Sequence, residues 1–318
     1  MQTNNTLLAK WHFISIFLIF LASANAAANN TVSEITWLQS DTAPFHLKKS
    51  AHAPDGGLCD YLIEQLIETL PNIKHTRLLL PQKRIGKYLD EGQMACYPCM
   101  IHREKSTDRV TYSMPTTVYP PFNIITTPAN AEAISLRHGD PVQLINLLTD
   151  THFIFGQTAA RKFTQEINEI ARNTKSYENA SLSWSSENES RAVIARLNHG
   201  YIDYTIDYPF LADYYNRFSE LSNVVALPIA NHQSNLVLGA VGCSSNAPNN
   251  FANNALQQIN QVLQHTILPS VQYQASQRQW LESTFPDFIT HYQQQILNVN
   301  RPANAAPAAV ENPNKAEQ

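Results

Sequence analysis

The sequence predicts an α/β protein made of two consecutive α/β units. Strand-type and helix-type patterns alternate along most of the chain, and the alternation starts again after an extended, proline-punctuated segment at 118–127. A further predicted strand, 236–241, has no neighbouring strand close to it in sequence. Alternating strands and helices are typical of mainly parallel sheets covered on both faces. We therefore expect two lobes, the first completed by the last third of the chain.

The first lobe is predicted from periodicity and turn residues. We expect strands at 35–38, 76–80 and 94–101 and a helix at 82–90 stopped by Gly92. Another helix follows Gly56-Gly57 and ends at Pro71, because apolar residues recur there at helical spacing: Leu58, Leu62, Ile63, Leu66, Ile67 and Leu70.

The second lobe and the final third follow the same reasoning. We expect helices at 142–148, at 161–172 and around 193–197, and strands at 152–155, 182–184, 201–208 and 224–229. Residues 251–263 and 272–292 are predicted to be helical. The predicted domains are a discontinuous lobe 1 (31–125 plus 232–295), lobe 2 (126–231) and a disordered tail (299–318) that lacks apolar periodicity.

Length, charge and the first residues bound the class of protein. The 318 residues, 43% hydrophobic and 15% charged, suffice for two modest domains. A net charge of -4 with mixed signs does not indicate a nucleic-acid or anionic-membrane partner. Residues 1–26 are predicted to be a signal peptide, with Lys10, a short apolar run and an Ala24-Asn25-Ala26 cleavage site. We therefore expect a soluble, periplasmic monomer.

The predicted export determines the redox environment of the four cysteines, Cys59, Cys96, Cys99 and Cys243. An oxidising compartment favours disulfides, and the three possible pairings stay open. Cys96-Tyr97-Pro98-Cys99 also resembles the Cys-x-Pro-Cys of thiol oxidoreductases, which leaves a redox function as an alternative. Since Cys96, Cys99 and His102 have no nearby fourth ligand and the histidines are scattered, we expect no metal and no cofactor.

Arg109 and Asp207 are the leading candidates for a ligand site. Arg109 follows the third predicted strand of lobe 1, and Asp207 ends a strand of lobe 2. Open α/β sheets place ligands at the carboxyl ends of their strands, so the two side chains should face one cleft. A guanidinium can bind a carboxylate bidentately, and an aspartate can accept from an ammonium. This pair predicts a zwitterionic ligand.

Ordered motifs give the chain a resemblance to a known family. They are Pro44-Phe45, Gly56 with Asp60, Leu89 with Gly92, Ser106-x-Asp108-Arg109, Tyr112-Ser113-x-Pro115, and Leu197-x-x-Gly200-x-x-Asp203 followed by Asp207. Across residues 31 to 295 the chain resembles extracellular solute-binding protein family 3, the periplasmic amino-acid-binding type, and most of all an uncharacterised proteobacterial branch of it. The resemblance implies a two-lobe, type II periplasmic-binding-protein-like fold with two hinge segments, ligand capture by lobe closure and no catalysis.

The resemblance also implies roles for single residues. Arg109 would clamp an α-carboxylate and Asp207 would meet an amino group. Asp41 and Phe45 lie on a loop that should line the cleft, Ser113 belongs to the Tyr-Ser-x-Pro motif, and Arg84 heads the second helix. Thr158, in Gly156-Gln157-Thr158, partly matches the turn that supplies further carboxylate donors. Thr42 stands where many relatives carry an aromatic residue that stacks on the ligand.

These expectations favour a binding protein over an enzyme. The leading hypothesis is an exported protein that captures a small polar, carboxylate-bearing, amino-acid-like solute for an inner-membrane permease of an ABC transporter or for a sensor receptor. The alternatives are a periplasmic thiol oxidoreductase that uses Cys96 and Cys99, and an enzyme evolved on the same scaffold. A Gly-x-Ser-x-Gly elbow is absent from the sequence.

Overall fold

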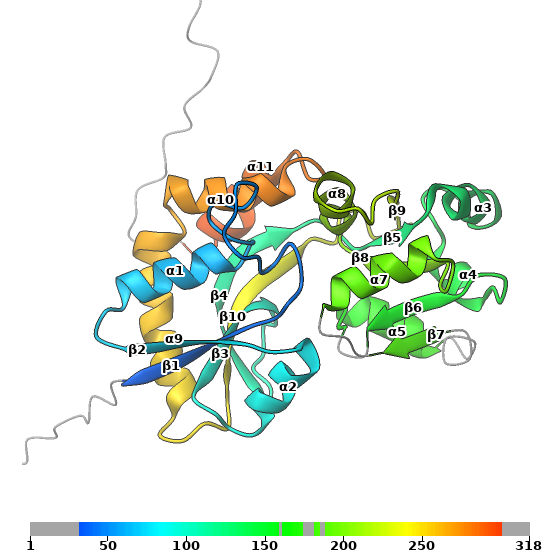
Figure 1. The fold of residues 1–318 in the computed structure, drawn as a ribbon. Helices are drawn as coiled ribbons and strands as arrows, with labels where there is room; N and C mark the ends of the chain where they lie inside the picture. The colour runs from blue at the N-terminus through cyan, green and yellow to red at the C-terminus, as the bar shows by residue number, and fades with distance from the viewer. Residues whose placement is uncertain (1–31, 159–160, 174–180, 185–187, 301–318) are drawn as a thin grey trace, which may run out of the picture. The chain divides into compact units, whose positions relative to one another are not determined.

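The computed structural model describes residues 32–158, 161–173, 181–184 and 188–300 (Figure 1). The predicted signal peptide and residues 301–318 of the predicted tail lie outside these ranges. The first two residues of that tail, Val299 and Asn300, are described, and they form a turn in which the Asn300 side chain donates to the carbonyl of Pro115 at 3.2 Å. Within the described ranges no helix is both long and apolar enough to cross a membrane.

The first sheet has the strand order β2-β1-β3-β10-β4. Its strands are β1 (Glu34–Gln39), β2 (Lys74–Leu79), β3 (Ala95–Ile101), β4 (Val110–Tyr119) and β10 (Val237–Ser244). β1 pairs in parallel with β2 and β3, whereas β10 lies between β3 and β4 and is antiparallel to both. The late strand β10 thus enters the sheet of the early strands.

The second sheet has the order β7-β6-β8-β5-β9. Its strands are β5 (Asn123–Thr126), β6 (Phe155–Thr158), β7 (Ser181–Trp184), β8 (Tyr204–Asp207) and β9 (Val225–Pro228). β6 is parallel to β7 and β8, and β5 is antiparallel to β8 and β9. Each sheet is therefore mainly parallel, as predicted, with one antiparallel strand: β10 in the first sheet and β5 in the second.

Helices flank both sheets (Figure 1). They are α1 (Asp60–Thr69), α2 (Gln82–Asp90), α3 (Pro128–His138), α4 (Leu144–Thr149), α5 (Gln165–Asn173), α7 (Glu189–Asn198), α8 (Pro209–Phe218), α9 (Phe251–Val262), α10 (Val271–Leu281) and α11 (Phe288–Tyr292), with π-helical turns at Leu263–Ile267 and Gln293–Leu297. Around the first sheet α9 packs against β4 and β10, and α2 packs against β3.

The structure confirms most predicted elements and corrects three. Helix α3 was not predicted, because only Ala131 and Ile134 are buried along it, although Thr127 caps it and Pro128 opens it. Helix α8 was not predicted either, and its Pro209 opens the helix rather than interrupting it. The strand predicted at 152–155 is observed later, at Phe155–Thr158.

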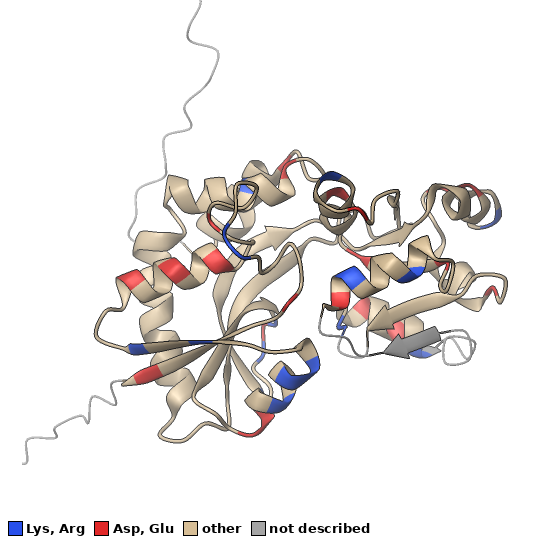
Figure 2. Cartoon of the chain, viewed as in Figure 1, with Lys and Arg blue, Asp and Glu red and all other residues tan. Residues whose placement is uncertain are grey.

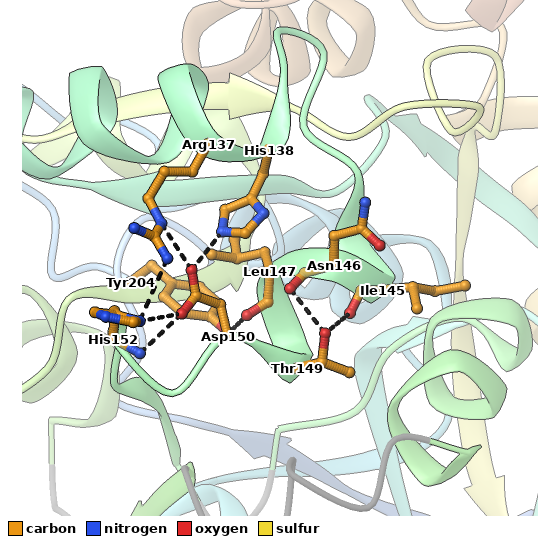
Figure 3. Close-up of polar contacts among 9 residues, drawn as sticks. All are labelled: Arg137, His138, Ile145, Asn146, Leu147, Thr149, Asp150, His152 and Tyr204. Atoms are coloured by element: carbon orange, nitrogen blue, oxygen red, sulfur yellow. Dashed lines mark hydrogen bonds and ion pairs between the residues drawn. The ribbon is translucent and has the colours of Figure 1, made fainter.

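A hydrogen-bond network around Asp150 explains why β6 begins late (Figure 3). The Asp150 carboxylate accepts from Arg137 Nε at 2.9 Å, pairs with His138 Nε2 at 2.9 Å and accepts from the backbone N–H of His152 at 2.9 Å. Burial works against ionisation, but these donors outweigh it and hold the pKa of Asp150 well below its usual value. The network keeps 150–152 in a turn and ties it to the end of α3.

Two disulfides join Cys59 to Cys99 and Cys96 to Cys243. Cys96 and Cys243 are cross-strand partners of β3 and β10. Cys96 and Cys99 lie three residues apart on one extended strand, about 10 Å at 3.3 Å per residue. A bridge needs Cα atoms within about 7 Å, so these two cannot pair with each other. The alternative of a thiol oxidoreductase required a Cys96–Cys99 dithiol, and in this structure the two cysteines belong to different disulfides.

Candidate functional site

The loop after β1 is held in place by a buried carboxylate at the start of α1. Asp60 is 4% exposed and accepts from Gln39 Nε2 at 2.7 Å and from the backbone N–H groups of Leu47 at 2.7 Å and Gly57 at 2.8 Å. It also bonds His46 Nδ1 at 2.8 Å. Burial raises the pKa of Asp60, but these partners outweigh it and the pKa is lowered. The loop bearing Thr42 and Phe45 is thereby fixed at both ends.

Gly57 lets this loop lie directly against the start of α1. The backbone N–H groups of Leu58 and Cys59 donate to the carbonyls of Pro44 and Phe45 at 3.0 and 2.9 Å. A Cβ on Gly57 would collide with those two carbonyl groups. Glycine is therefore required here by close backbone approach.

A cavity of about 140 Å³ lies between residues that come from the two sheets. Thr42 and Phe45 reach it from the loop after β1, and Arg161 and Lys162 from the segment after β6. Its other lining residues are Gln82, Tyr97, Cys99, Met100, Ile101, Arg103, Tyr112, Tyr119 and Tyr208. All three charged side chains in its lining are cationic. No Asp or Glu lines the cavity among the residues that the structure describes.

An aromatic cluster forms one wall of the cavity. The Phe45 ring meets Tyr119, Tyr208 and Phe210 edge-on, with centroids 5.8, 6.0 and 5.5 Å apart. Such contacts each contribute about 0.5–1.5 kcal/mol beyond burial. Tyr97 sits nearby with its hydroxyl 3.1 Å from Ser40 Oγ, and burial, opposed by that hydrogen bond, raises its pKa to about 12. The tyrosine hydroxyls that line the cavity are therefore neutral hydrogen-bonding groups at neutral pH.

Arg161 is the most constrained cation of the site. Its Nη2 donates to Asp207 Oδ1 at 2.6 Å, and the two side chains are 15% and 13% exposed. The guanidinium lies over the rings of Phe122, Tyr208 and Phe163, 5.1, 5.3 and 5.7 Å from their centroids. Its Nε is buried and makes no hydrogen bond with the described residues. Burial raises the pKa of Asp207, against the influence of Arg161.

Arg103 and Lys162 are the other two cations. Arg103 follows β3 of the first sheet, and Lys162 follows β6 of the second. In the described part of the chain neither forms an ion pair. Both also line an adjoining groove of about 540 Å³, which runs along α2 past Lys83 and Lys87. Figure 2 shows Lys and Arg residues (blue) along α2 and an acidic residue (red) at its C-terminal end.

A second, small cavity of about 20 Å³ shares Thr42, Gln82 and Arg161 with the first. It is also lined by Glu189, which is 3% exposed and whose carboxylate oxygens have no hydrogen-bond partner of normal geometry among the described residues. Burial raises the pKa of Glu189, although Thr158 and Arg161 favour its ionised form. A space of this size holds about one water molecule.

The residues singled out from the sequence lie in different places. Phe45 lines the main cavity, and Thr158 and Asp207 line the small one. Arg109 lines the groove, where its side chain is 54% exposed and forms a bidentate ion pair with Asp90.

The remaining three lie away from these spaces. Asp41 and Arg84 are exposed. Ser113 is buried, and its Oγ donates to the Met114 carbonyl and accepts from the Val241 N–H, which supports the β4–β10 pairing. Asp41, Arg84 and Ser113 line neither of the two cavities nor the adjoining groove. Their roles as ligand contacts stay predictions.

Sequence reasoning did not single out Arg103, Arg161, Lys162 or Tyr208. The sequence pointed toward two of them, because Arg161 and Lys162 come three and four residues after Thr158, which had been singled out. Tyr208 adjoins Asp207. Arg103 was overlooked in favour of Arg109, although both follow the same strand.

One group of side chains has the composition of a metal site. His46, Cys59 and Cys99 place one ligand atom each within 4.8 Å of one another. The two sulfur atoms form a disulfide, however, which leaves the imidazole as the sole available ligand of the three.

Comparisons with known proteins identify the fold. No protein-family model matches the sequence, and no curated protein matches it. A histidine kinase sensor domain with similarity to periplasmic binding proteins superposes with a TM-score of 0.58 at 14% identity, covering 80% of this chain and 97% of that one. An ancestral arginine-binding protein bound to arginine gives 0.56 at 14% identity, covering 78% and 98%.

A third solved structure agrees with these two. An amino acid ABC transporter substrate-binding protein from Streptococcus pneumoniae, bound to L-arginine, gives a TM-score of 0.56 at 14% identity, covering 79% of this chain and 93% of that one. At such identities the likeness concerns the fold alone. The two mixed sheets flanked by helices thus form a type II periplasmic-binding-protein-like fold.

Proposed function

We propose that this chain is an exported solute-binding protein that captures a small, carboxylate-bearing solute in the 140 Å³ cavity. The observation that carries the proposal is the cavity's charge: Arg103 and Lys162 line it from different sheets, and no carboxylate lines it among the described residues. Two cations that form no ion pair with the described residues, at a partly enclosed site, favour an anionic ligand.

The aromatic wall supports the same conclusion. Ligand sites combine apolar and aromatic surface with a few convergent polar groups, and this cavity has that composition. An anion that contacts Arg103 and Lys162 together links the two sheets through itself. Ligand binding would then favour the closed arrangement of the lobes, because only that arrangement lets both cations reach one ligand.

The ligand-bound form would be recognised by a membrane partner. Solved structures of this fold include an ABC transporter's substrate-binding protein and a histidine kinase sensor domain. We therefore propose a transport permease or a sensor receptor as the partner. An enzymatic role has less support, because the cavity holds neither an ionised carboxylate nor a histidine among its described lining residues.

The test is a thermal-shift screen with amino acids and small organic acids, followed by calorimetry of the hits on wild type and Arg103→Gln. One charge-assisted hydrogen bond is worth about 1.5–3 kcal/mol, so affinity should fall about ten- to hundredfold. Lys74→Gln is the matched control, because Lys74 is exposed on β2 and pairs with Glu34. An anion that binds equally well to wild type and Arg103→Gln would contradict the assigned site.

A further inference from the structure

The carboxylate and the rings around Arg161, which could otherwise accept a ligand's ammonium group, are already occupied by that side chain. An ammonium group is accepted by carboxylates or by the faces of aromatic rings. Asp207 offers the carboxylate, and Phe122, Phe163 and Tyr208 offer the rings. Arg161 forms the ion pair with Asp207 and lies over all three of these rings.

The Arg161–Asp207 contact is built to persist. Asp207 Oδ1 accepts from Arg161 Nη2 at 2.6 Å and from the backbone N–H of Tyr208 at 2.7 Å. Both side chains of the ion pair are largely buried. Exchanging Arg161 for a ligand ammonium would strand a buried guanidinium without its counter-ion, which is strongly unfavourable.

The side chains of the cavity that can still interact with a charged ligand are therefore cationic. Arg161 and Asp207 neutralise each other, whereas Arg103 and Lys162 have no ion-pair partner in the described residues. Two cations match a ligand with two negative charges, and an added ammonium would face like charges.

We propose that the cavity selects small dicarboxylic acids that carry no ammonium group, with Arg161 as the internal cation that excludes α-amino acids. This inference rests on the proposed function and names the ligand class of the same site. The size agrees, because cavities of about 150 Å³ accommodate a six-carbon ring and this one measures about 140 Å³. Longer acids can extend into the adjoining groove past Lys83.

Glu189 is the competing acceptor for a ligand ammonium. Its carboxylate is buried, but it lies in the cavity of about 20 Å³, where a single water fits. Burial raises the pKa of this carboxyl group, while Thr158 and Arg161 beside it already stabilise its ionised form. Glu189 therefore does not restore an ammonium site.

The experiment compares glutarate with L-glutamate, which differ by one ammonium group. Calorimetry on the wild-type chain should show glutarate binding at least about tenfold more tightly. Arg161→Gln frees Asp207, so the preference should fall or reverse at about pH 8, where the carboxylate is kept ionised. Equal or tighter binding of glutamate by wild type, or the same preference in Arg161→Gln, would overturn the inference.

A second variant guards against misfolding of Arg161→Gln. Asp207→Asn keeps the shape of the side chain and releases the charge of Arg161 toward the cavity, so glutarate should bind several-fold more tightly. Unchanged or weaker glutarate binding in a variant with a native near-ultraviolet spectrum would count against the inference. Lys74→Gln again serves as the control for loss of a distant charge.

The same data separate this inference from the proposed function. If wild type prefers glutamate and Arg103→Gln weakens the binding of both ligands, the cavity binds carboxylates and only the selectivity is refuted. If wild type binds neither ligand, the dicarboxylate inference fails. The proposed function is then decided by the wider panel of organic acids.

Discussion

Replacing Asp60 with asparagine tests how the loop that carries Phe45 is held. The carboxylate is 4% exposed and has four partners: Gln39, His46 and the backbone N–H groups of Leu47 and Gly57. An asparagine keeps one acceptor oxygen and turns an N–H₂ group toward donors. The charge is lost, and at least one pair of buried donors is left unsatisfied.

The cost follows from the burial of the network. Hydrogen bonds to a charged group contribute about 1.5–3 kcal/mol each, so the loss of two of them in Asp60→Asn should lower the free energy of unfolding by about 3–6 kcal/mol. Urea unfolding with both disulfides intact measures it. Glu68→Gln is the control, because Glu68 is exposed on the same helix and its loss should change stability by at most about 0.5 kcal/mol.

The pH dependence supplies an independent check. The folded-state pKa of Asp60 is lowered. Its contribution is therefore fully present above the unfolded-state pKa of about 3.9 and is lost as the pH falls through the folded-state pKa. Wild type and Asp60→Asn should differ most near neutral pH and converge in acid. A neutral-pH difference below about 1 kcal/mol, or one that persists in acid, would refute the role assigned to this carboxylate.

Two further substitutions address the site loop and the second sheet. Gly57→Ala should cost about 1–3 kcal/mol of overpacking and weaken solute binding, because its Cβ pushes against the carbonyls of Pro44 and Phe45; unchanged calorimetric affinity would contradict this. Asp150→Asn should cost about 1–2 kcal/mol in urea unfolding at neutral pH, less than Asp60→Asn, because its partners Arg137 and His152 are exposed. Since the pKa of Asp150 is lowered, that difference should also disappear in acid.

Local pattern was sufficient for much of the fold. The helix predicted at 82–90 is observed at the same residues as α2, because its apolar positions recur at helical spacing and Gly92 follows with a positive φ of 71°. The return of strand 236–241 to the first sheet was predicted as well, since a strand without a local partner must pair elsewhere. β10 lies between β3 and β4.

The predictions failed where tertiary contacts override local pattern. β6 starts at Phe155 because hydrogen bonds to Asp150 hold the preceding residues in a turn. Strand β4 runs through Pro115, although proline is disfavoured inside a sheet because it lacks a backbone N–H. The register shift between Gly239 and Ala240 accommodates the proline, as a β-bulge does.

For the candidate site as well, the sequence indicates which types of residue are available, but the tertiary structure decides which of them can reach a ligand. Arg109 and Arg103 follow the same strand, and side-chain chemistry alone cannot rank them. Arg109 forms an ion pair with Asp90, which lies nineteen residues earlier in the chain, so its guanidinium has a partner. Asp207 was expected to be open to a ligand, and the structure pairs it with Arg161.

The sequence by itself determined that this chain alternates helices and strands in two units and that its last third returns to the first unit. It also showed that charged residues follow several strands, at the sheet edge where open α/β proteins bind their ligands. Those properties depend on local spacing and on the pairing that every strand requires. Only the tertiary structure decided which charges are cancelled. The ion pairs of Arg109 with Asp90 and of Arg161 with Asp207 join residues 19 and 46 positions apart, so sequence spacing does not reveal them. The cations that form no ion pair with the described residues, rather than the cation nearest a motif, are the ones available to a ligand.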